Sequence, residues 1–82
     1  FIMAEAVDGV VSTCHALGLP HLAGQLHGVR EVQDEAGVAR LEDRLLLVTK
    51  LLQLRPLPQA ARPQLAAAVE VLGNMIREVR YS

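Results

Sequence analysis

Apolar residues recur at alternating spacings of three and four along much of the chain, which is the pattern of a helix with one buried face. The first such run consists of Met3, Val7, Val10, Cys14 and Leu17. Gly18 and Pro20 follow this run directly. Glycine favours a left-handed helix end and proline cannot continue a helix, so the pattern predicts a first helix over residues 2–17.

Two further apolar stripes follow Pro20. The first contains Leu22, Leu26, Val29 and Ala36, and the second contains Leu41, Leu45, Val48 and Leu52. At about 100° per residue, the second stripe is rotated from the first by about a third of a turn, so one straight helix could not direct both at the same core. We expect a break between helices over residues 20–36 and 38–54. The alternative is one long bent helix over residues 20–54.

The segment 55–63, RPLPQAARP, contains three prolines and is predicted to be a connector. Pro63 is expected to open the last helix. The stripe of this helix is Leu65, Val69, Leu72, Ile76 and Val79. No run of alternating residues with a hairpin turn indicates a strand. Short connections between four helices predict an all-α, antiparallel up-down bundle, and the single bent helix would reduce the number to three.

Length and composition limit what this bundle can contain. A chain of 82 residues has room for one domain, so we expect a single helical bundle over residues 1–82. The chain is 51% hydrophobic, with Phe1 and Tyr81 as its only aromatic residues. The core must therefore consist of Leu, Val and Ala with a little Met and Ile. Because the chain begins at Phe1 and not at Met, we expect it to be a domain excised from a larger protein.

The charge pattern argues against two classes of partner. A formal net charge of −1 creates no field that would attract nucleic acid or an anionic membrane. Residues 9–29 carry no Asp, Glu, Lys or Arg, but their histidines and the Gly18 to Pro20 break argue against a membrane span. Cys14 is the only cysteine, which excludes an intramolecular disulfide and is consistent with a reducing compartment, which we take to be the cytoplasm.

No set of titratable residues points to a reaction. His15, His21 and His27 are six residues apart, and this spacing places neighbours on different helix faces, unlike a zinc site. Three carboxylates, Glu31, Asp34 and Glu35, fall on the polar side of the helix predicted over residues 20–36 and are expected to face water. Cys14 lies within an apolar stripe, where it is expected to be a small buried hydrophobic residue. We therefore expect no enzymatic activity, no metal and no cofactor.

The helix predicted over residues 38–54 carries more apolar surface than one stripe. Relative to Leu41, the flank of Leu47, Leu51 and Leu54 lies about 80–140° away, and Leu46 lies on the far side. The last helix has a similar flank that includes Val71 and Met75. Contacts with two neighbouring helices would cover part of this surface. Any part that stays exposed would form a groove or patch suited to another helix.

This surplus predicts a non-catalytic protein-interaction or oligomerisation domain, of the adaptor or scaffold kind. The predicted partner-binding residues are Leu46, Leu47, Leu51, Leu54, Val71 and Met75. The expected partner is an amphipathic helix of another protein or a second copy of this chain. The alternative is a carrier in which the same flanks line an interior cavity for a lipid or a small apolar ligand. In a bundle that needs no partner, Leu46 should be a lone exposed leucine.

Overall fold

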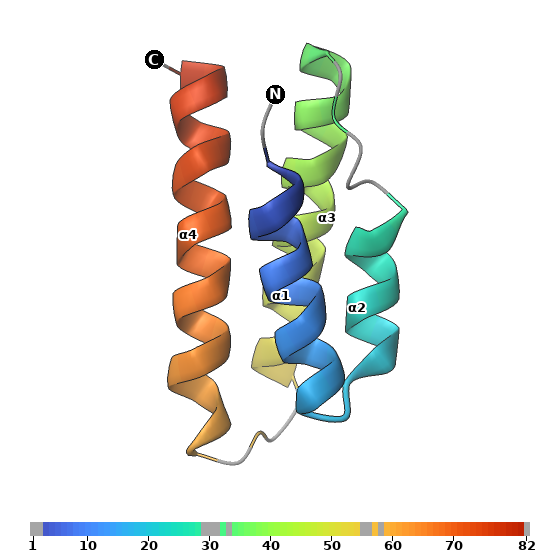
Figure 1. The fold of residues 1–82 in the computed structure, drawn as a ribbon, viewed down its shortest axis with the longest axis vertical. Coiled ribbons are helices and arrows are strands. Elements are labelled where there is room, and N and C mark those ends of the chain that lie inside the picture. The colour runs from blue at the N-terminus through green and yellow to red at the C-terminus, as the bar shows by residue number, and fades with distance from the viewer. Residues whose placement is uncertain (1–2, 29–31, 33, 55–56, 58, 82) are drawn as a thin grey trace.

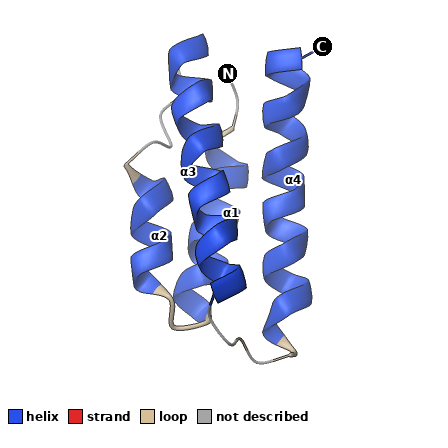
Figure 2. Ribbon diagram, turned by 180° about the vertical axis from the view of Figure 1, so that it is seen from behind, coloured by secondary structure: helices blue, strands red, loops and turns tan. Residues whose placement is uncertain are grey.

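The computed structural model describes residues 3–28, 32, 34–54, 57 and 59–81. Within these residues the chain forms four helices: α1 (Ala4–Ala16), α2 (Pro20–His27), α3 (Glu35–Leu54) and α4 (Ala61–Tyr81). Consecutive helices run in opposite directions, and the described residues contain no strand (Figures 1 and 2). The predicted all-α, antiparallel bundle of four helices is confirmed.

The four helices close around one core. Both α1 and α3 pack against α2 and α4, so each helix has two neighbours in a ring. The bundle measures 35 × 22 × 20 Å along its principal axes. Because the number of helices is even, α1 begins and α4 ends at the same end of the bundle (Figure 1).

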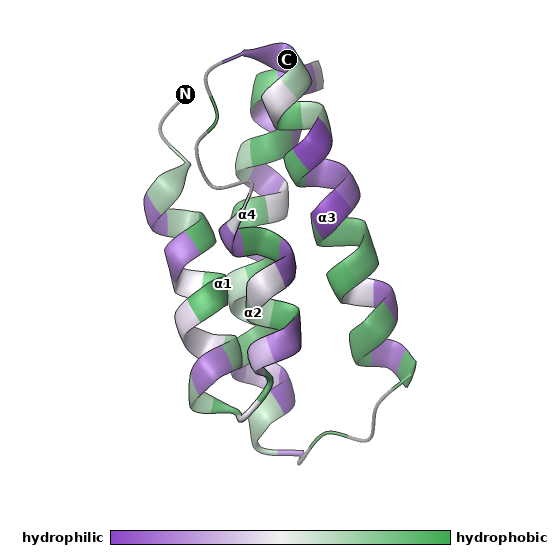
Figure 3. Ribbon diagram, turned by 90° about the vertical axis from the view of Figure 1, so that its right-hand side faces the viewer, coloured by the Kyte–Doolittle hydropathy of each residue, from purple (hydrophilic) through white to green (hydrophobic). Residues whose placement is uncertain are grey.

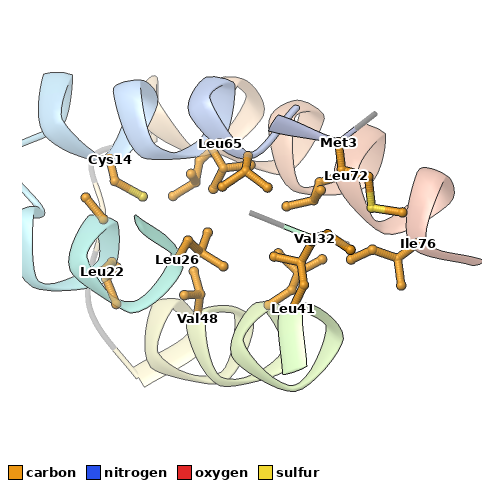
Figure 4. Packing of buried hydrophobic residues seen from close by; sticks show 14 of the residues in the cluster. Met3, Cys14, Leu22, Leu26, Val32, Leu41, Val48, Leu65, Leu72 and Ile76 are labelled. Carbon is orange, nitrogen blue, oxygen red and sulfur yellow. The ribbon is translucent and has the colours of Figure 1, made fainter. Parts of the chain in front are cut away.

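One aliphatic stripe from each helix forms the core. Its members on the helices include Val7, Val10 and Cys14 of α1, Leu22, Ala23 and Leu26 of α2, Val38, Leu41, Leu45 and Val48 of α3, and Leu65, Leu72 and Ile76 of α4. Their side chains point inward from all four helices (Figure 4). No polar or charged residue in the described part of the chain is buried. Burial of aliphatic surface is therefore the dominant source of stability.

The burial pattern follows the predicted stripes with one clear exception. The positions at the stripe ends or edges, Leu17, Leu52, Val69 and Val79, are only partly buried. Ala36 was predicted to lie on the apolar face of a helix over residues 20–36, but it is exposed in the first turn of α3. That prediction is wrong because Ala36 belongs to the following helix. Val29 of the same stripe lies outside the described residues.

The end of α1 has the predicted glycine signal. Gly18 adopts a φ of 72°, a left-handed conformation that glycine tolerates without a steric penalty. The Gly18 N–H donates to the His15 carbonyl at 3.1 Å, and the Leu19 N–H donates to the Cys14 carbonyl at 2.8 Å. This is the Schellman arrangement, in which two carbonyls at the helix end gain donors. Pro20 then begins α2, where its missing N–H breaks no helical bond.

The boundary between the second and third helices differs from the prediction. Instead of spanning residues 20–36 and 38–54, α2 ends at His27 and α3 begins at Glu35. Asp34 sets the start of α3, because its Oδ1 accepts a hydrogen bond from the Gly37 N–H at 2.8 Å. An aspartate in this position is a strong N-cap. The alternative of one bent helix over residues 20–54 is therefore wrong.

The outer bounds also shift by a few residues. The first helix was predicted over residues 2–17 and spans Ala4–Ala16, with residue 2 outside the described chain. The last helix begins at Ala61, two residues before Pro63. Pro63 lies in the first turn, where backbone N–H groups have no partner within the helix and proline is tolerated.

Polar side chains connect α3 to both of its neighbours. On the α2 side, Arg44 donates to the Gln25 side-chain oxygen at 2.8 Å. On the α4 side, Glu42 accepts a hydrogen bond from Arg80 at 2.5 Å and one from the Tyr81 hydroxyl at 3.3 Å. These groups are partly exposed, so each contributes little to stability. They do identify which side of α3 faces which helix.

Two glycines give opposite predictions for stability. Gly24 lies inside α2 with open space around the position of an added Cβ, so Gly24→Ala should stabilise the protein by about 0.5–1 kcal/mol. Gly18→Ala would force alanine into the left-handed region and should destabilise it by about 1 kcal/mol. Urea unfolding followed by circular dichroism measures both changes. A loss of stability in Gly24→Ala would contradict the assignment of that residue to an exposed helix interior.

Candidate functional site

Large apolar side chains remain exposed on α3 in the isolated chain. The exposed fraction is 80% for Leu54, 56% for Leu46 and 37% for Leu47. Leu46 is therefore not a lone exposed leucine, because two others accompany it on the same helix. Leu51 differs from them, since it is partly buried and packs against the core.

The exposed leucines fall on two sides of α3. Leu46 lies one turn beyond Glu42, on the side that faces α4. Leu47 lies three residues beyond Arg44, on the side that faces α2, and Leu51 and Leu54 continue that side. Between these sides lies the outward surface of the helix.

The two predicted residues on α4 belong to a different surface. Counting about 100° per residue from buried Leu72, Val69 and Gly73 lie on the side next to α3, whereas Val71 and Met75 lie on the opposite side, toward α1. Val71 is 55% exposed, and Met75 is partly buried against the core. The structure therefore does not bring all six predicted partner-binding residues together: the four on α3 and the two on α4 lie on separate surfaces.

We define the outer face of α3 as the residues between Ala36 and Leu54 that point about 120–180° away from Leu41. These residues are Ala36, Ala39, Asp43, Leu46, Leu47, Lys50, Gln53 and Leu54. All are exposed except Ala39, which is half-buried. The outer face is thus mainly apolar, with one acid and one base near its middle. Hydrophobic and hydrophilic bands alternate along α3 (Figure 3).

A surface hollow lies between the last turns of α3 and the first turns of α4. Its volume is about 330 Å³, and apolar side chains that include Leu52, Leu57, Leu65 and Val69 line it. Thr49, Gln53, Arg62 and Glu70 provide its polar groups. The two helices diverge toward this end of the bundle (Figure 3). The hollow occurs where this divergence leaves a wedge that the connector residue Leu57 fills only in part.

A second hollow of about 270 Å³ lies further along the same pair of helices, toward the end where Glu42 meets Arg80. Leu45, Leu46, Gly73 and Ile76 supply its apolar lining, with Glu42 and Arg77 beside them. Leu46 is the only predicted partner-binding residue that lines either hollow. Sequence periodicity did not indicate the hollows, because it gives the direction of each side chain and not the distance between two helices.

The polar residues do not form a reactive cluster within the described chain. His15, His21 and His27 are all exposed. Among the described residues, no group of three or more His, Cys, Asp or Glu side chains is arranged to hold a metal ion. Asp34 and Glu35 are exposed to water, as expected, but they lie at the start of α3 and not on a helix over residues 20–36, so their predicted common face is wrong. Glu31 lies outside the described residues.

Cys14 is a free cysteine inside the core of the bundle. Burial raises the pKa of its thiol, because the thiolate would lose hydration among aliphatic neighbours. A nucleophilic cysteine requires the opposite environment, one that is partly exposed and favours the thiolate. Cys14 therefore acts as a small apolar residue in this fold, as the sequence predicted.

Comparison with protein-family models, curated proteins and solved structures finds no match to this chain. No helix of the described residues combines the length and apolar character needed to cross a bilayer.

The burial of Cys14 predicts slow thiol chemistry. In the folded protein at neutral pH, alkylation by iodoacetamide should be at least about tenfold slower than in urea-unfolded protein, because the thiol is both covered and held in its protonated form. Mass spectrometry of quenched samples gives both rates. Equal rates in native and unfolded protein would contradict the placement of Cys14 in the core.

Proposed function

We propose that this chain is a non-catalytic protein-interaction domain that binds an amphipathic helix of a protein partner on the outer face of α3. The supporting observation is the exposure of Leu46, Leu47 and Leu54 on α3, a helix whose other stripe is buried in the core of the bundle. Scattered exposed leucines are ordinary, but these three border the outer face of α3 from both sides and together form the kind of apolar patch that proteins use for association.

The apolar area of the three exposed leucines is consistent with a weak, reversible interaction. Full burial of a leucine contributes about 1.5–3 kcal/mol relative to an exposed one, so covering the exposed parts of these three side chains would contribute about 3–5 kcal/mol. Association costs about 4–15 kcal/mol in lost translational and rotational freedom. The leucines alone therefore do not give tight binding. Apolar groups of the partner and paired charges must supply the remainder.

The dimensions of the outer face suit a helix as the partner. From Ala36 to Leu54 it extends about 27 Å at 1.5 Å per residue, which is about five helical turns. Its apolar residues recur at helical spacing, so a second amphipathic helix could pack along it by inserting side chains between them. A short loop or an extended peptide would leave much of this length uncovered.

A second candidate function is the binding of a small apolar ligand in the hollow between α3 and α4. A volume of about 330 Å³ is at the lower end of the range for small-molecule sites, and its lining is mainly aliphatic. Arg62 and Glu70 at this hollow could orient a polar head group. This candidate differs from the carrier predicted from the sequence, because the hollow lies at the surface between two helices and not in the core.

Photo-crosslinking tests the proposed interaction. A photoreactive phenylalanine derivative placed at Leu54 should form crosslinks to a protein in cells that express the chain, because Leu54 is the most exposed large apolar residue described. The matched control is the same group at Val71, which is also exposed but lies on α4 toward α1. Adding Leu47→Glu to the Leu54 variant should remove the crosslinks. Equal crosslinking from positions 54 and 71 would contradict the assignment to α3.

Organic extraction of the purified protein followed by mass spectrometry tests the second candidate. A bound apolar compound at near-stoichiometric yield is expected if the hollow is a ligand site, and Val69→Trp should remove it by filling the space. Val71→Trp, on the other side of α4, serves as the control and should retain the compound. Extraction that yields no compound would remove this candidate.

A further inference from the structure

The outer face of α3 is complementary to itself when two copies are placed antiparallel. If the midpoint lies between Leu46 and Leu47, Leu46 of each copy lies at the level of Leu47 of the other copy. In the same register Asp43 lies opposite Lys50, and Ala39 lies opposite Leu54. All six residues point away from the core of their own bundle, within about 60° of the direction opposite to Leu41.

We propose that the partner of this face is a second copy of the chain, bound through α3 against α3 about a twofold axis that passes between Leu46 and Leu47. This inference rests on the proposed function and names its partner. A twofold interface uses the same patch on both subunits, so each favourable contact occurs twice. The apolar surface that one copy exposes is then covered by the same surface of the other.

Charge complementarity decides the direction of the two helices. Asp43 and Lys50 are both exposed and are separated by about 10.5 Å along α3. The structure gives neither of them an ion pair with any residue in the described part of the chain. In an antiparallel dimer, Asp43 of each copy meets Lys50 of the other, which makes two opposite-charge pairs. A parallel dimer would place Asp43 near Asp43 and Lys50 near Lys50, so like charges would repel.

Side-chain size supports the same register. Leu54, which is 80% exposed, lies opposite the small side chain of Ala39 at each end of the contact. A large side chain facing a small one allows two helices to interdigitate without a gap or a clash. At the centre, Leu46 and Leu47 of the two copies form an apolar cluster of four leucines. The charged pairs flank this cluster and fix the register.

The contact is confined to about four turns of one helix from each subunit, which is small compared with a standard interface of about 800 Å² per partner. We therefore expect reversible dimerisation that depends on protein concentration. Exposed ion pairs are screened by salt, so the affinity should fall as ionic strength rises.

Charge exchange at two positions tests the dimer by sedimentation equilibrium over a wide concentration range. The unmodified chain should shift from the mass of one chain to that of two as concentration rises. Asp43→Lys alone and Lys50→Asp alone each replace two attractive pairs by two repulsive ones and should weaken self-association by about tenfold to a hundredfold. An equimolar mixture of the two variants should restore association as a heterodimer. The double variant D43K/K50D should restore the homodimer.

Both positions are exposed, so the folded bundle should be retained in every variant, and circular dichroism with urea unfolding checks this. A wild-type chain that remains monomeric throughout would overturn the proposal, as would single variants that associate as well as wild type. So would a mixture or a double variant that fails to restore association while remaining folded. If the chain is monomeric but position 54 still crosslinks to a different protein, the interaction function stands and only the identity of the partner is wrong.

Discussion

Burial of one aliphatic stripe from each of four helices is the interaction on which this structure depends. The described core contains no aromatic ring and no polar group, so its stability comes from the removal of Leu, Val, Met, Ile and Ala surface from water. Such a core requires all four helices, because each stripe is covered only by its two neighbours in the ring. A chain of this size has little stability to spare. Its exposed leucines add nothing to that stability in the isolated molecule, because they remain in contact with water.

Side-chain periodicity predicted the elements of this fold well and their limits less well. The stripes on the first, third and last helices were correct because spacing alone determines which residues share a helix face. The break after the second helix was misplaced, since the prediction used the rotation between two stripes and overlooked Asp34 as an N-cap. The hydrogen bond from the Gly37 N–H to Asp34 sets the start of α3. That local signal was present in the sequence, because Asp34 stands three residues before Gly37, the residue whose backbone N–H it caps.

The candidate site was predictable in part. The surplus of leucines on α3 was visible in the sequence, and their angular positions correctly separated buried Leu41 and Leu45 from exposed Leu46 and Leu54. The sequence did not show that Val71 and Met75 lie on the far side of α4 from α3. That requires knowing which side of each helix faces which neighbour, and only contacts such as Glu42 with Arg80 establish it. The hollow beside α4 depends on the divergence of two helices, for which periodicity carries no information.

The contact among Glu42, Arg80 and Tyr81 affects how this molecule can be observed. Tyr81 is the only tyrosine and the chain has no tryptophan, so Tyr81 is its only strongly ultraviolet-absorbing side chain. The Arg80 guanidinium lies over the Tyr81 ring, with its Cζ atom 5.2 Å from the ring centroid, and the Tyr81 hydroxyl donates a hydrogen bond to Glu42. The fluorescence of Tyr81 therefore reports on the last turn of α4 and its attachment to α3. A change in that signal before the helical circular dichroism falls would indicate fraying of this corner alone, whereas cooperative melting of the interior would change both signals together.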